Sequence, residues 1–166
     1  LKRLDVSNNG ITLMAEDALV DVRFLTHLNM SYNNLREIKP RTFSGLNRLE
    51  KLDLSHNELI ALPDRLLGDQ SQLKEVSFAH NQIQLVSSQL LSEDNRVEVL
   101  DFTANFVLDF PEQLINKMNS LQKLNFRRNS IQRLGRASFR GLRELESLDM
   151  HDNRIEVIED AAFADL

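Results

Sequence analysis

Residues 49–59 read LEKLDLSHNEL and residues 73–83 read LKEVSFAHNQI, so one pattern of aliphatic residues and an asparagine returns after 24 residues. The pattern fills the whole chain in seven copies, and no insertion interrupts them. The copies begin at Leu1, Leu25, Leu49, Leu73, Val97, Leu121 and Leu145. A fixed period of this length indicates a repeat protein in which each copy forms one structural unit.

The apolar residues keep fixed positions when counted from the first residue of each copy. Positions 1, 4, 6, 11, 14 and 19 are apolar in all seven copies, although apolar residues make up only 42% of the chain. Polar and apolar residues alternate from position 3 to position 7, which is the period of a strand with one buried face. We therefore expect positions 4 and 6 to point into a core and positions 3, 5 and 7 to point outward.

No copy can bury its apolar residues alone, so we expect the copies to stack. Their strands would form one parallel sheet on the inner curve, with the returning segments on the outer curve. Position 9 is the polar exception in a buried turn, and it is asparagine in every copy: Asn9, Asn33, Asn57, Asn81, Asn105, Asn129 and Asn153. An amide both donates and accepts, so these structural asparagines can pair with backbone groups that the turn leaves free.

The spacing LxxLxLxxNxLxxLxxxxFxxLxx resembles the leucine-rich repeat family, in the 24-residue form common in animal extracellular proteins. The phenylalanine position of that family is aromatic in three copies and aliphatic in four: Phe43, Phe139, Phe163, Leu19, Leu67, Leu91 and Ile115. The resemblance covers residues 1–166 as a single array. It implies an α/β solenoid, or horseshoe, with a parallel sheet on the concave face and irregular or short helical segments on the convex face.

The uninterrupted copies are similar to ectodomain segments of Toll-like receptors and of chaoptin-like adhesion proteins. This resemblance implies a non-enzymatic scaffold, outside the cell or on its surface, that binds a protein ligand or cell-surface partner through its concave face. A second interpretation is a structural spacer or a self-associating array. Solenoids carry polar terminal caps, and none is visible here. We therefore expect an interior segment of a longer protein, with any membrane attachment outside this segment.

The composition argues against other classes of function. The formal net charge is −5, unlike the basic surface of nucleic-acid-binding proteins, so we expect no nucleic-acid partner. No run of 18 apolar residues is present that would span a membrane. The five glycines lack the spacing of a phosphate-binding loop, and no nucleophile motif occurs. We expect no catalytic residues and no cofactor.

Two histidines are the only residues whose placement suggests metal binding or acid–base chemistry. His56 and His80 share position 8 in adjacent copies, which would place them about 5 Å apart on neighbouring strands, near Asp53 and Asp101. One interpretation is a metal site or an acid–base pair. The other is two polar surface residues in one row with Tyr32, and on that basis we expect no metal.

The concave side turns apolar in the fourth and fifth copies, at Ala79, Val99, Ala104 and Phe106. Phe106 is anomalous, because position 10 is polar or glycine in every other copy. An exposed aromatic residue ringed by polar groups is typical of an interface hot spot, whereas the alternative is that Phe106 packs over the turn. The candidate ligand-binding residues are Tyr32, His56, His80, Val99, Asp101, Ala104, Phe106, Arg127, Arg128 and His151.

Position 5 forms a largely acidic row of Asp5, Asn29, Asp53, Ser77, Asp101, Asn125 and Asp149. It either attracts a cationic partner or is simply the polar outer side of the sheet. Asn29 also begins the sequon Asn29-Met30-Ser31 and is a candidate glycosylation site. A glycan at this position would close the N-terminal part of the concave face to protein partners.

Charge is divided unevenly near the C-terminus: residues 121–144 carry a net charge of +6, and residues 145–166 carry −6. Stacking would pair Arg128 with Asp152, Arg136 with Asp160, and Lys51 with Glu75. Exposed ion pairs contribute only about 0–1 kcal/mol each. We therefore expect these pairs to keep neighbouring copies in register, while Arg127 and Arg128 remain candidates for an acidic ligand.

Overall fold

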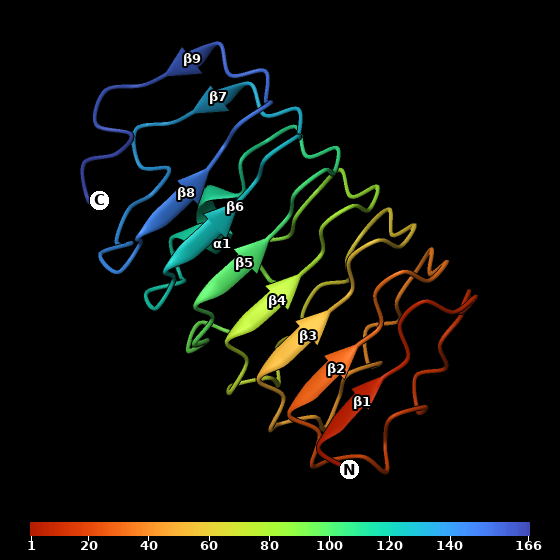
Figure 1. The fold of residues 1–166 in the computed structure, drawn as a ribbon. Coiled ribbons are helices and arrows are strands. Elements are labelled where there is room, and N and C mark those ends of the chain that lie inside the picture. The colour runs from red at the N-terminus through yellow and green to blue at the C-terminus, as the bar shows by residue number, and fades with distance from the viewer.

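The computed structural model describes residues 1–166 as a curved stack of coils with one parallel sheet on its concave side (Figure 1). Seven strands lie in sequence order: β1 (Arg3–Asp5), β2 (His27–Asn29), β3 (Lys51–Asp53), β4 (Glu75–Ser77), β5 (Val99–Asp101), β6 (Lys123–Asn125) and β8 (Ser147–Asp149). Each residue pairs with its equivalent in the next copy, as Leu28 does with Leu52. The predicted fold class is confirmed.

Hydrogen bonds between copies extend beyond the three residues of each strand. The carbonyl of Thr26 accepts the N–H groups of Glu50 and Lys51 at 2.8 and 3.0 Å. Past the strand, the N–H of His56 donates to the carbonyl of Ala79 at 2.8 Å. The same bonds recur along the array, so neighbouring copies are in register both at the strands and at the turns that follow them.

The core lies between the sheet and the returning segments as one cluster of 38 buried residues. Three phenylalanines at position 6 stack along it, with ring centroids 5.1 Å apart for Phe78 and Phe102 and 5.2 Å apart for Phe102 and Phe126. Burying each such ring contributes about 1.5–3 kcal/mol. Leu4 and Leu148 are only partly buried, because each end copy has a neighbour on one side alone.

Asn57 shows how position 9 joins two copies. Its Nδ2 donates to the carbonyls of Met30, Leu54 and Ser55 at 3.0, 3.1 and 3.2 Å. Its Oδ1 accepts the N–H of Leu35 at 3.1 Å. The other buried asparagines with the same four bonds are Asn33, Asn81, Asn105 and Asn129. Asn9 is exposed and Asn153 is half-buried, each in an end copy.

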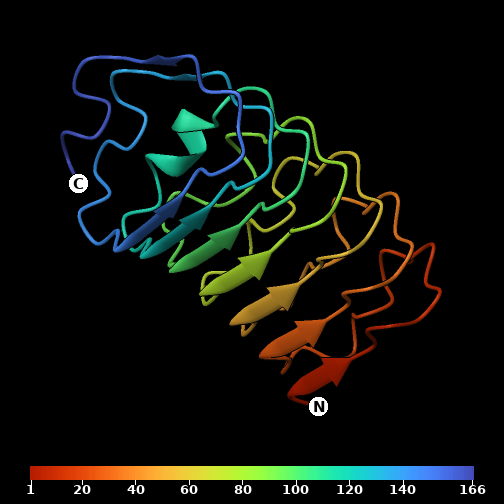
Figure 2. The ribbon, with the colours of Figure 1, turned by 45° about the horizontal axis from the view of Figure 1, so that its top comes forward.

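The convex side has little regular structure (Figure 2). It contains one short helix, α1 (Glu112–Ile115), and a two-stranded parallel sheet of β7 (Arg133–Leu134) and β9 (Val157–Ile158). A single bridge joins Leu67 to Leu91. The rest consists of turns that return the chain to the next strand. No helix here has the length and apolar character needed to cross a membrane.

Candidate binding site on the concave face

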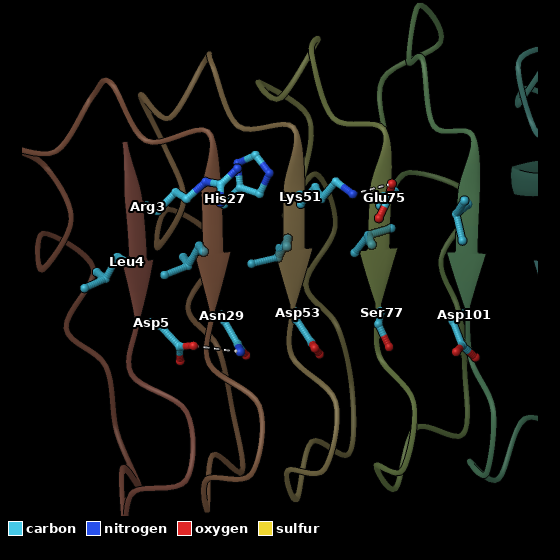
Figure 3. Close-up of a pocket in the computed structure, with 14 residues that line it drawn as sticks. Arg3, Leu4, Asp5, His27, Asn29, Lys51, Asp53, Glu75, Ser77 and Asp101 are labelled. Atoms are coloured by element: carbon cyan, nitrogen blue, oxygen red, sulfur yellow. Dashed lines mark hydrogen bonds and ion pairs between the residues drawn. The ribbon is translucent and has the colours of Figure 1, made fainter. Parts of the chain in front are cut away.

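A groove of about 420 Å³ follows the concave face across β1 to β5. Figure 3 shows two rows of polar side chains along it. The position-3 row contains Arg3, His27, Lys51 and Glu75, and the position-5 row contains Asp5, Asn29, Asp53, Ser77 and Asp101. Lys51 and Glu75 form an ion pair at 2.6 Å, as their shared position predicts. The groove therefore presents both signs of charge, with Val99 at its far end.

The position-5 row has a local structural role. The Oδ1 of Asp101 accepts the N–H of Thr103 at 2.8 Å and its hydroxyl at 2.6 Å. A side-chain oxygen at position 5 accepts the N–H two residues later in all seven copies. Short polar side chains suit this turn, which explains why the row contains only aspartate, asparagine and serine. This geometry favours the structural interpretation of the acidic row.

Position 8 lies in the turn beyond the carboxyl end of each strand, and its side chains form a third row. The rings of Tyr32 and His56 are stacked with centroids 4.0 Å apart and planes 8° apart. The rings of His56 and His80 continue the stack at 4.2 Å and 9°. We call these three residues the ring ladder. Stacked rings contribute about 0.5–1.5 kcal/mol beyond their burial, so the ladder holds three of the candidate residues in fixed orientations.

The charge state of His56 follows from its place in the middle of the ring ladder. Partial burial lowers its pKa below the ordinary value, because the imidazolium form loses hydration. Repulsion from a charged His80 lowers this pKa further, and Asp53 opposes both effects. His56 therefore favours the neutral, stacking form.

The geometry of the histidine pair bears on the two interpretations that the sequence left open. No group of three or more histidine, cysteine or acidic side chains is placed to hold an ion. The lone pairs of stacked imidazoles lie in parallel ring planes, whereas ligands of one ion must converge on it. Of the two interpretations from the sequence, the structure supports a polar surface row with Tyr32.

Beyond His80 the same row continues with Ala104, Arg128 and Asp152. Ala104 is half-buried, and the Nε of Arg128 lies 3.4 Å from Oδ2 of Asp152, an ion pair expected from their shared position. His151 reaches the other carboxylate oxygen of Asp152 at 3.1 Å. Arg128 is therefore the neighbour, in the next copy, of Ala104, the only aliphatic member of the row.

The structure exposes part of the predicted apolar patch. Phe106 is 54% exposed, so it does not pack over the turn, and Val99 and Ala104 are half-buried. Ala79 was expected beside them but is buried, as are Ser31 and Ser55, because the chain turns inward after position 5. The prediction that position 7 points outward is therefore wrong for these three copies.

Other candidates differ in accessibility. Arg128 and His151 are exposed, whereas Arg127 is half-buried and its Nε has no hydrogen-bond partner.

The predicted pairing of Arg136 with Asp160 does not occur. Instead Arg133 pairs with Glu159, whose other oxygen accepts the N–H of Arg136 at 2.9 Å.

Sequence reasoning missed one feature of the surface. Ile60, Leu85 and Leu108 are exposed on the side of the array that follows the asparagine turn, in the third, fourth and fifth copies, of which the fifth also contains Phe106. Their signal is weak, because positions 12 and 13 vary freely between copies. Apolar residues there look like isolated substitutions until the copies are stacked.

The model of the family described as Leucine rich repeat matches residues 1–59 and 95–155, which together exceed half of the chain. The chain belongs to the leucine-rich repeat family. Each 24-residue copy, with its strand at positions 3–5 and its asparagine turn, is thus one leucine-rich repeat. No curated protein sequence matches this array.

Solved structures of other leucine-rich repeat arrays superpose on nearly all of it. The receptor in the TLR13–ssRNA13 complex has a TM-score of 0.89 and 25% identity, covering 99% of this chain and 23% of its own. Drosophila Toll in its complex with Spatzle has a TM-score of 0.86 and 25% identity, covering 95% and 22%. An internalin, inlF, of Listeria monocytogenes shares the fold at a TM-score of 0.79 and 22% identity, over 100% of this chain and 45% of its own. The chain therefore spans less than a quarter of the first two proteins.

Proposed function

We propose that this leucine-rich repeat array is a non-enzymatic recognition scaffold that lies outside the cell or on its surface. Its ligand is a protein, bound along the concave groove and the ring ladder. Similarity to Toll, whose structure is a complex with Spatzle, supports this class of function. The observation that carries the proposal is the ring ladder of Tyr32, His56 and His80, which is partly exposed and already ordered.

The proposed mechanism is rigid presentation. Each immobilised side chain costs about 0.5–1.5 kcal/mol of entropy when a complex forms. Here turn hydrogen bonds already hold the position-5 row, and stacking holds the ring ladder. A ligand therefore meets a surface that needs little further ordering.

The proposal is tested by measuring capture of purified extracellular proteins on the immobilised array, with a single-stranded RNA in the same panel. The triple variant Tyr32→Ala, His56→Ala, His80→Ala should weaken binding of the captured protein at least about tenfold, because hot-spot residues dominate affinity. A matched triple variant in the returning segments, Glu16→Ala, Arg41→Ala, Arg140→Ala, should leave it unchanged. Equal affinities for the two variants, or capture of RNA alone, would contradict the proposal.

Self-association is the competing function, since Phe106 is exposed and the same array also exposes Ile60, Leu85 and Leu108. Light scattering of the unmodified protein and of Phe106→Asp separates the two functions. We expect a monomer in both cases. A dimer that Phe106→Asp dissociates would instead favour the self-associating array.

A further inference from the structure

The position-8 row is built on a repeated backbone conformation. Its members all adopt a positive φ of 53–56°: Asn8, Tyr32, His56, His80, Ala104, Arg128 and Asp152. The N–H groups of the first six donate to the position-7 carbonyl of the next copy at 2.7–3.0 Å. Because backbone and register are the same in each copy, the Cβ atoms of the row project in parallel from neighbouring copies.

The spacing of this row already accommodates stacked rings. Tyr32, His56 and His80 place three rings at separations of 4.0 and 4.2 Å. The next member is Ala104, whose side chain is a single methyl group. The face of the exposed His80 ring toward Ala104 is therefore not covered by a ring from the chain itself.

Arg128 stands on the other side of Ala104. Its guanidinium is planar, 57% of its side chain is exposed, and Asp152 holds it by the ion pair at 3.4 Å. Two strand spacings, about 9.5 Å, separate the position-8 residues of the fourth and sixth copies. A ring stacked on His80 at the spacing of the ladder would leave about 5 Å to the place of Arg128 in the row. When the guanidinium turns from Asp152 toward Ala104, it therefore comes within the roughly 6 Å reach of a cation–π contact with that ring. One ring fits, and two stacked rings do not.

We propose that Ala104 marks a subsite for one aromatic side chain of the protein ligand, held between the imidazole of His80 and the guanidinium of Arg128. This inference rests on the proposed function and names the chemistry that the ligand must bring. An electron-rich ring, that of tyrosine or tryptophan, suits a place between the imidazole of His80 and the guanidinium of Arg128, since guanidinium groups favour such rings. Phe106, two residues along the same turn, adds exposed apolar surface for the rest of the side chain.

N-acetyl-tryptophanamide is the probe, titrated against the isotopically labelled protein and followed by NMR. Binding on the order of 1 mM is expected for a ligand this small, with ring-current shifts at the Ala104 methyl and the His80 ring. Ala104→Tyr should abolish the probe-induced shift at the His80 ring by filling the subsite from within, and Arg128→Ala should weaken binding several-fold. Tyr32 already adopts the same backbone conformation, so the tyrosine substitution is compatible with the turn.

Ala15→Tyr, at an exposed alanine in a returning segment, is the matched control and should bind the probe as the unmodified protein does. The inference is overturned if Ala104→Tyr binds the probe normally, or if N-acetyl-leucinamide gives the same shifts and affinity. Protein capture that persists in Ala104→Tyr would overturn this inference while leaving the proposed function intact. Probe binding at Ala104 without capture of any extracellular protein would contradict the proposed function alone.

Discussion

The imidazole rings of His56 and His80 lie parallel, with centroids 4.2 Å apart and planes 9° apart. Two cations at this separation repel each other, so the stack is most favourable when at least one ring is neutral. Burial and this repulsion lower the pKa of His56. The stability of the ring ladder is therefore coupled to pH.

This coupling predicts a loss of stability in mild acid. The unfolded chain titrates at the ordinary histidine pKa, so as the pH falls through that value protons bind the unfolded state first and favour it. Stability is fully present above the unfolded pKa and declines until the pH passes below the lowered pKa of folded His56. Thermal unfolding measured between about pH 7.5 and pH 5 should show this decline.

His56→Tyr is the control for the pH experiment, because it keeps a ring in the ladder and removes the titration. Its unfolding temperature should fall less than that of the unmodified protein over the same pH range. Identical pH profiles for the two proteins would show that other titrating groups, and not His56, cause the acid effect.

Asn81→Ala should cost about 1–3 kcal/mol of unfolding free energy, since it leaves the buried N–H of Leu59 unpaired and one such group costs about that much. The change removes the acceptor for the N–H of Leu59 and the donor to the carbonyls of Leu54, Phe78 and Ala79. Denaturant titration measures the loss. Asn34→Ala, at an exposed asparagine, should change stability by less than about 0.5 kcal/mol. Similar values for the two substitutions would refute a special role for position 9.

Asp101 tests whether the position-5 row contributes to stability through its turn hydrogen bond or through its charge. Asp101→Asn keeps the oxygen that accepts the Thr103 N–H and should change stability by less than about 0.5 kcal/mol, whereas Asp101→Ala should cost about 1 kcal/mol. Both variants are compared by denaturant titration. If Asp101→Asn is as destabilising as Asp101→Ala, then the charge matters rather than the turn hydrogen bond.

Asn29 provides a test of the concave face as a binding surface. Its Oδ1 accepts the N–H and hydroxyl of Ser31, and the groove runs alongside it. We expect the protein secreted from animal cells to carry a glycan here, seen as a mass shift that an N-glycosidase removes and that Asn29→Gln abolishes. Removing the glycan should increase capture of a concave-face ligand. Capture that is unaffected by the glycan would place the ligand away from the groove.

The fold was predictable because every structural constraint acts on several copies at once. A core position such as that of Leu28 is seen again at Leu52 and in each other copy, so chance apolar residues are averaged out. The lateral pairings of Lys51 with Glu75 and of Arg128 with Asp152 were likewise predictable, because stacking places equal positions side by side.

The details of the surface were less predictable, because they depend on the path of the chain after the strand. Strict alternation predicts that Ala79 is exposed, but the turn buries it. The proximity of His56 and His80 followed from their shared position. Their parallel stacking depends on side-chain rotamers and on a left-handed backbone that the sequence pattern does not specify.

The asparagine turns also constrain how such an array can change in length during evolution. Each buried side chain joins a carbonyl and an N–H of the preceding copy to its own turn, as Asn57 does with Met30 and Leu35. Adding or deleting one residue in this turn would disrupt two neighbouring units at once. Gain or loss of a complete unit leaves every junction intact, so the reach of the concave face changes in whole steps, and shorter insertions are confined to the convex loops.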